Sequence, residues 1–211
     1  MRPTIAGFLS GALGLSKAAI LNTEWVFGGV PSGYGAITIG STVNFDEDDL
    51  SNNDIAFWVE TVGHESTHRD DIENQGFFSF YWEYLRQYFS GRDTKEPHNE
   101  AYENIDAEKK AYGNQKQIDQ FFSDPQNYDD FMGVLNNKSL SDSKKSDLLE
   151  ALGIERVASP SLNNLAVGLT NKLQSLDQKT DSALIKAIND LLSYINTAIS
   201  NDQKNIKKLR S

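Results

Sequence analysis

Two histidines and a glutamate stand close together in the segment His64-Glu65-Ser66-Thr67-His68. Residues four apart in a helix lie on one face, a turn apart, so both imidazoles can reach one tetrahedral zinc ion. Glu65 would project towards the open side of the metal. There it can take a proton from zinc-bound water and later pass it to a leaving amine. The segment therefore predicts a zinc site with His64 and His68 as ligands and Glu65 as the catalytic residue.

The surroundings of this segment favour a helix that carries a metal site. The spacing is the HExxH arrangement of metallopeptidases, and two of the three histidines in the chain lie in it. Asn53 or Asp54 can cap a helix that runs to about Asn74 and has an apolar stripe at Ile55, Trp58, Val59 and Val62. The alternative interpretation is a surface helix with two solvated histidines.

A catalytic zinc site needs a third protein ligand. The chain has no cysteine, so nitrogen and oxygen atoms must hold any metal. The candidates are Asp70, Asp71, Glu73, His98, Glu100, Glu103, Asp106 and Glu108. We favour Glu108, which lies in a helix expected over Glu100 to about Phe122 and shares a face with Ile105 and Ala111. A carboxylate on an apolar face needs a partner, and zinc would supply one.

Further groups are expected around the metal. A metal-bound histidine usually donates its other N–H to a carboxylate or a carbonyl oxygen, and the candidates for this acceptor are Asp70, Asp71 and Asp106. A donor that stabilises the oxyanion of a tetrahedral intermediate is also expected. The candidates for that donor are Tyr112, Tyr102 and His98.

Short strands are expected ahead of the site helix. Trp25 to Phe27 reads as a strand that ends at Gly28-Gly29, and residues 31–35 read as a turn. Ala36 to Phe45 alternates and is rich in β-branched residues, which predicts one further strand. In metallopeptidases of this type such a strand would run beside the cleft.

The composition disfavours some partners. The chain has 30 acidic and 20 basic residues. Its formal net charge of −10 disfavours nucleic acid or an anionic membrane as the main partner. Residues 5–21 are apolar, but Lys17 interrupts the run, which is shorter than the roughly 20 residues that span a bilayer. We expect a buried packing segment there, with a signal peptide or a membrane-interacting segment as alternatives.

Helices are expected over most of the remaining chain. Phe77 to Phe89 is rich in aromatic residues, which predicts a helix packed in the core beneath the site helix. An aromatic substrate groove is the alternative interpretation of this segment. Tyr128 to Leu135 and Ser143 to Leu152 are short helical candidates.

The composition changes from Ser161, where aromatic residues nearly vanish and leucine and isoleucine stripes predict a helical hairpin over residues 161–209. A linker is expected near Ala158-Ser159-Pro160. The sequence therefore predicts a mainly α protein with a small β element. Its expected domains are a metallopeptidase core over residues 1–157 and a hairpin appendage over residues 158–211.

Segments of the first half of the chain resemble a known family. The strand AITIG, then GHESTH, FFSFYWEYLRQYFSG and AYENIDAEKKAY, resemble the gluzincin-type zinc metallopeptidase domains of bacterial Rhs and other polymorphic toxins, including type VI secretion-associated effectors. The resemblance covers roughly residues 28–113 and implies a zincin-like core. By this resemblance the zinc ligands would be His64, His68 and Glu108, and Glu65 would be the catalytic glutamate. The chain departs from the pattern at Arg69-Asp70-Asp71, where glutamine is common, and at Asp106, where proline is common.

The resemblance implies a secreted or injected bacterial effector that cleaves a protein in the cytoplasm of a target cell. The hairpin over residues 161–209 lies outside the resemblance. Its stripes either pack on each other or cover a helix of a partner such as an immunity protein or a chaperone. The alternative function is a catalytically inactive metal-binding or scaffold domain that acts through these helices. Glu65 favours the enzyme, because an inactive protein has no need of it.

Overall fold

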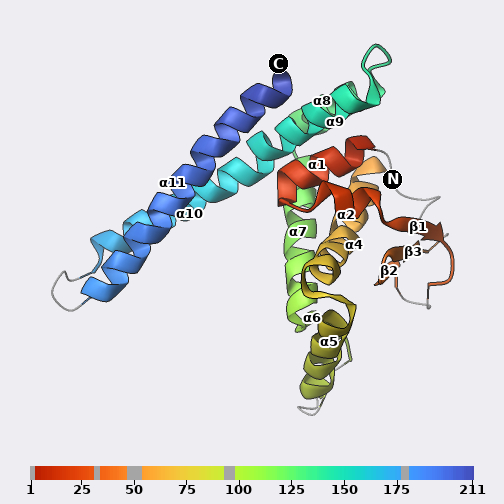
Figure 1. The fold of residues 1–211 in the computed structure, drawn as a ribbon, viewed down its shortest axis with the longest axis horizontal. Coiled ribbons are helices and arrows are strands. Elements are labelled where there is room, and N and C mark those ends of the chain that lie inside the picture. Colours follow the sequence, from red (N-terminus) through yellow and green to blue (C-terminus); the bar gives the residue numbers. More distant parts are fainter. Residues whose placement is uncertain (1–2, 31–33, 47–53, 93–97, 177–180) are drawn as a thin grey trace.

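The structure is a computed structural model that describes residues 3–30, 34–46, 54–92, 98–176 and 181–211. Helices dominate and three short strands form one sheet (Figure 1), which confirms the predicted mainly α class with a small β element. The strands are β1 (Glu24–Phe27), β2 (Ala36–Ile39) and β3 (Thr42–Phe45). The helices are α1 (Pro3–Leu13), α2 (Lys17–Leu21), α4 (Ile55–Gln75), α5 (Phe77–Arg92), α6 (His98–Glu103), α7 (Asp106–Phe122), α8 (Pro125–Asn136), α9 (Asp142–Gly153), the π-helical turn η1 (Ile154–Ala158), α10 (Ser159–Gln174) and α11 (Ser182–Arg210).

The sheet has the strand order β1-β3-β2, with β1 parallel and β2 antiparallel to β3. The prediction of one strand over Ala36 to Phe45 is wrong, because the chain reverses at Gly40-Ser41 to form a hairpin. Gly40 has a φ of 62°, which glycine adopts at little cost. β-branched residues lie on both sides of this turn, so the sequence pattern resembles that of one continuous strand. The reversal leaves β2 at the edge of the sheet. Residues 31–33 of the expected turn lie outside the described residues.

The expected packing role of residues 5–21 is confirmed, since α1 buries Ala6, Phe8, Leu9 and Ala12. Gly7 and Gly11 let α1 approach α9 closely, because a β-carbon at either position would overlap the backbone of Ser146 or Glu150. Within the described part of the chain, no helix has the length and hydropathy needed to cross a membrane.

The site helix α4 begins where the sequence predicts, at the cap Asp54, whose carboxylate accepts from the backbone N–H of Phe57. The prediction of one helix over Glu100 to Phe122 is wrong, because the chain breaks at Ile105 between α6 and α7. Ile105 is buried with an extended backbone, and Gln87 of α5 accepts from the N–H of Asp106. That side chain satisfies a donor at the start of α7, and the new helix can begin there.

The prediction that α5 packs in the core is wrong. Phe80 is the buried residue among the described side chains of α5, whereas Phe78 is 86% exposed and Trp82 is 73% exposed. The helix projects below α4 and α7 (Figure 1), so most of its aromatic surface lacks a core to pack against.

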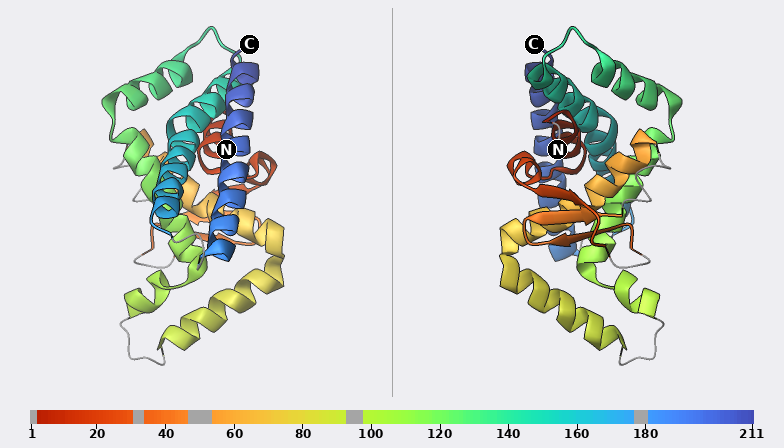
Figure 2. Two further views of the ribbon diagram at one scale, coloured as in Figure 1. Left: turned by 90° about the vertical axis from the view of Figure 1, so that its left-hand side faces the viewer. Right: turned by 90° about the vertical axis from the view of Figure 1, so that its right-hand side faces the viewer.

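The C-terminal hairpin is confirmed as α10 and α11, which extend together away from the rest of the molecule (Figures 1 and 2). The predicted linker at residues 158–160 is wrong, because α9, η1 and α10 follow one another without a loop. Pro160 lies in the first turn of α10, where its missing N–H is tolerated. Within α10 and α11, Ile188 and Ile195 are the buried residues.

Replacing Gly11 by alanine should destabilise the protein by about 1–3 kcal/mol, because the added methyl group overlaps the backbone of Glu150 in α9. Gly133 of α8 is the matched control, since it is helical and has open space where a β-carbon would lie. Gly133→Ala should instead stabilise by up to about 1 kcal/mol. Urea unfolding measures both. Equal effects of the two substitutions would contradict the close contact between α1 and α9.

Candidate metal centre

His64 and His68 of α4 meet Glu108 of α7 in the interior between the two helices. His64 Nε2 lies 3.3 Å from Glu108 Oε2, and His68 Nε2 lies 3.4 Å from Glu108 Oε1. The two Nε2 atoms are 3.2 Å apart. One ligand atom from each residue lies within 4.8 Å of the others, and Glu108 is 1% exposed. The structure thus brings together the three predicted ligands in a buried group that could bind a metal ion.

The charges in this group favour an ionised carboxylate. Burial raises the pKa of Glu108, but the two imidazoles and the Tyr84 hydroxyl more than offset it and hold the pKa well below its usual range. Burial lowers the pKa of His68, but the hydrogen bond and the negative charge of Glu108 raise it overall. Within the described residues, Glu108 Oε2 is buried without a partner in hydrogen-bond geometry. A cation at this oxygen would compensate its burial.

An amide orients the first histidine, since His64 Nδ1 lies 3.1 Å from Gln115 Oε1. Gln115 thus occupies the place for which the sequence suggested a carboxylate. The carboxylates proposed for this role bond elsewhere: Asp70 to the backbone N–H of Ser16, Asp71 to Lys110 and Asp106 to Gln87. Gln115 lies about two helical turns beyond Glu108 and so on the same face of α7, and its spacing could have identified it once Glu108 was chosen.

Of the other candidates for the third ligand, those whose side chains the structure describes do not join the group. Glu73 lies 3.8 Å from Arg69 in an ion pair on α4, and Glu103 is exposed. The side chains of His98 and Glu100 lie outside the described residues. Glu108 is therefore the candidate that the described structure brings to the two histidines.

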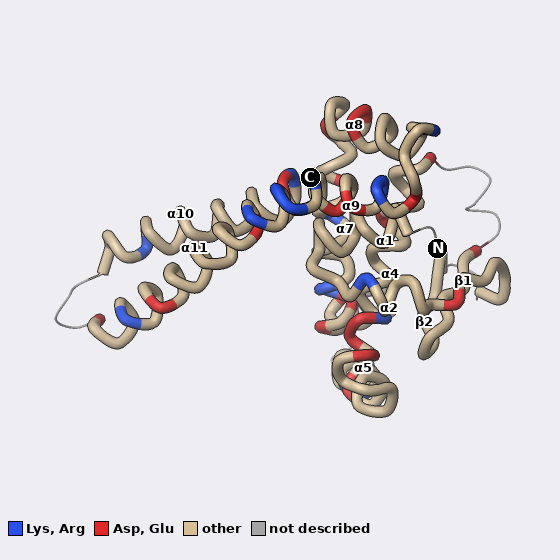
Figure 3. Tube along the Cα trace, turned by 45° about the horizontal axis from the view of Figure 1, so that its top comes forward, with Lys and Arg blue, Asp and Glu red and all other residues tan. Residues whose placement is uncertain are grey.

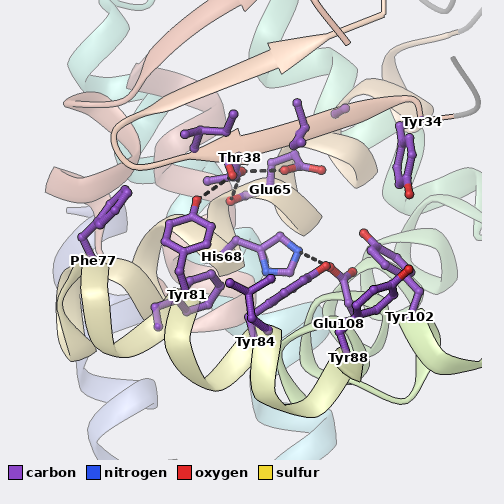
Figure 4. Close-up of a pocket in the computed structure, with 15 residues that line it drawn as sticks. Tyr34, Thr38, Glu65, His68, Phe77, Tyr81, Tyr84, Tyr88, Tyr102 and Glu108 are labelled. Atoms are coloured by element: carbon purple, nitrogen blue, oxygen red, sulfur yellow. Dashed lines mark hydrogen bonds and ion pairs between the residues drawn. The ribbon is translucent and has the colours of Figure 1, made fainter. Parts of the chain in front are cut away.

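A cleft of about 590 Å³ opens beside the ligand group. Figure 4 shows strand β2 along one wall and α5 along the opposite wall, with Glu65, His68 and Glu108 between them. The rest of the lining is mainly apolar or aromatic and includes Ile37, Ile39, Phe77, Phe80, Tyr81 and Leu85. The aromatic residues of α5 thus line a groove, which was the alternative interpretation of that segment. Glu65 accepts a hydrogen bond from Thr38 of β2, with 2.5 Å between Thr38 Oγ1 and Glu65 Oε2.

Phenol groups stand around the carboxylate of Glu108. Tyr84 donates to Glu108 Oε1 at 2.7 Å, and Tyr102 lines the same cleft. Burial and the negative charge of Glu108 raise the pKa of both phenols, so both remain hydrogen-bond donors. Tyr112 packs against the His64 ring, with 4.7 Å between ring centroids. The sequence suggested Tyr102 and Tyr112 as donors but missed Tyr84, which it assigned to core packing.

Metal-free protein should bind one divalent transition-metal ion per chain. Glu108→Ala should weaken this binding by more than about 100-fold, and Gln115→Ala by about 10–100-fold because Gln115 only orients His64. The affinity should fall as the pH is lowered, since a proton on His68 occupies the nitrogen that the metal requires.

Competition with a chromophoric chelator measures these affinities, and Glu103→Ala, which changes an exposed glutamate nearby, should leave them unchanged. Equal metal affinity in Glu108→Ala and the wild type would remove Glu108 from the site.

Comparisons of the chain with models of protein families, with curated proteins and with solved structures gave no match. The chemistry of the site therefore rests on its own geometry. That geometry comprises a buried group of two histidines and a glutamate, a second carboxylate in the cleft wall, and an edge strand beside both.

Proposed function

We propose that the protein is a zinc-dependent metallopeptidase in which His64, His68 and Glu108 hold the metal. The observation that carries this proposal is the buried group of these three residues at a cleft that also contains Glu65. Two imidazoles and one carboxylate are the ligand set of several catalytic zinc sites in peptidases, which keep a fourth position for water or substrate. Among the described residues, no further histidine, aspartate or glutamate joins these three ligands. This agrees with a site that keeps its fourth position open.

Zinc held in this way would lower the pKa of a water molecule and polarise a substrate carbonyl. Glu65 lies in the cleft wall beside His68 and Glu108. We assign to Glu65 the role of the general base, which takes the proton from the attacking water and returns it to the leaving amine. Tyr84 donates its one proton to Glu108, so the hydroxyl of Tyr102, which lines the same cleft, is the candidate to stabilise the oxyanion.

The cleft favours an extended peptide as the substrate. β2 lies at the edge of the sheet and also lines the cleft, so an extended chain could pair with those backbone groups of β2 that Tyr81 does not occupy. The apolar and aromatic wall opposite, formed by α5, offers contacts for the side chains of that peptide. Both features support cleavage of peptide bonds rather than of a small molecule.

Glu65→Gln should retain zinc but lower the rate of peptide cleavage by at least about 100-fold, because the amide cannot act as the base. The measurement combines zinc content by mass spectrometry with cleavage of a fluorescently labelled unfolded protein. Glu73→Gln, the same replacement at an exposed position of the same helix, should leave both unchanged. Loss of zinc from Glu65→Gln, or full activity in it, would contradict the assigned role.

We further propose that the peptidase is a bacterial effector or toxin that cleaves a protein in a target cell. The support is the ordered resemblance of four segments over roughly residues 28–113 to metallopeptidase domains of polymorphic toxins. An immunity protein or a chaperone would be the natural partner of such a domain.

Expression of the wild type in the cytoplasm of a bacterium should therefore slow growth, whereas Glu65→Gln at the same protein level should not. Growth curves, with immunoblots to match the expression, provide the measurement. Equal growth of both strains would argue against toxicity and leave the peptidase activity to be judged on the purified protein.

A scaffold function is the second candidate, and the hairpin favours it. Leu165 of α10 and Leu184, Leu191 and Tyr194 of α11 are all exposed. Charged side chains are sparse along α10 (Figure 3), where Lys172 is the charged residue of Ser159–Gln174, so the exposed face of this helix suits a protein partner. A scaffold would keep its biological effect in Glu65→Gln, whereas a peptidase would lose it.

A further inference from the structure

Thr38 links the edge strand β2 to the carboxylate of Glu65. Thr38 Oγ1 donates to Glu65 Oε2 at 2.5 Å and lies 3.3 Å from the backbone carbonyl oxygen of Glu65. A hydroxyl has one proton to donate, and the shorter contact, to the charged carboxylate, is the stronger hydrogen bond. Both side chains are buried. The carboxylate of Glu65 is thus held at one oxygen by a residue from a different element.

Thr38 is itself fixed from two sides. Across the cleft, the Tyr81 hydroxyl of α5 donates to the carbonyl oxygen of Thr38 at 2.9 Å and accepts from the N–H of Gly40 at 3.3 Å. Within the sheet, Thr38 pairs with Val43 of β3, which is fully buried in the core. Figure 4 shows Tyr81 and Glu65 both directed at Thr38. The sheet and α5 together therefore determine where the Thr38 hydroxyl lies.

We infer that Thr38 is a positioning residue that holds the Glu65 carboxylate in the orientation required to take a proton from the attacking water. The inference rests on the proposed peptidase function. A glutamate side chain has several rotatable bonds, and fixing it in advance removes the entropy cost of ordering it during the reaction.

Thr38→Val tests this role, since it removes the hydroxyl and keeps a β-branched side chain of similar size. We expect kcat to fall about 10–100-fold, the effect of a misplaced catalytic group, with KM and zinc content unchanged. Thr38→Ser restores the hydroxyl and should recover most of kcat. Thr42→Val is the matched control, because it makes the same change in β3, where the hydroxyl bonds to exposed Glu24. It should leave kcat unchanged.

Crystal structures of the wild type and Thr38→Val give a readout that does not depend on activity. The Glu65 carboxylate should lie against Thr38 in the wild type and leave that position in the variant. Wild-type kcat in Thr38→Val, an unmoved Glu65, or losses of zinc and thermal stability that match the loss of kcat would each overturn the positioning role. If zinc-loaded wild type cleaves no peptide, the proposed function itself fails. An active wild type with an equally active Thr38→Val overturns only the role of Thr38.

Discussion

Burial of the Glu108 carboxylate is the constraint on which the site depends. An ionised carboxylate away from water is costly unless charged or hydrogen-bonding partners surround it. His64, His68 and Tyr84 supply these partners, and each of the two imidazoles faces a different carboxylate oxygen. The two histidines belong to α4, Tyr84 belongs to α5 and Glu108 itself belongs to α7. The carboxylate therefore has all its partners only when these helices are packed together. Loss of any one partner leaves a buried charge that the remaining ones must compensate.

The register of α4 against α7 follows from the same need. Three polar contacts join the facing sides of α4 and α7. Because the helices are antiparallel, later residues of α4 contact earlier residues of α7. The contacts are Asp71 to Lys110, Thr67 to Asn114 and His64 to Gln115. Gly63 lets α4 pack closely on α1, since a β-carbon there would lie 3.3 Å from Leu9, and Ile118 of α7 would lie at ordinary contact distance. A shift by one helical turn would break these contacts together and carry Glu108 away from the histidines. The ligand geometry is therefore a property of the helix pair.

What the sequence could predict depends on the range of the interactions. His64, Glu65 and His68 lie within one turn of a helix, and their spacing alone indicates their chemistry. Glu108 was also within reach, because a carboxylate on an apolar face requires a partner. The turn at Gly40 was missed because β-branched residues flank it on both sides. The hydrogen bond from Thr38 to Glu65 was out of reach, since it follows from how β2 docks on α4. Composition likewise could not separate an aromatic cleft wall on α5 from an aromatic core.

The charges in the cleft favour a divalent cation as the partner of Glu108. Glu65 and Glu108 are the acidic residues in a lining that is otherwise apolar, aromatic or neutral apart from His68. Protonated imidazoles can offset this negative charge, as the raised pKa of His68 indicates, but a proton on His68 Nε2 uses the lone pair that would bind a metal. A divalent cation on two neutral imidazoles and Glu108 balances both carboxylates at once. It also leaves the Glu65 carboxylate, held by Thr38, as the acidic group of the cleft outside the metal-binding group.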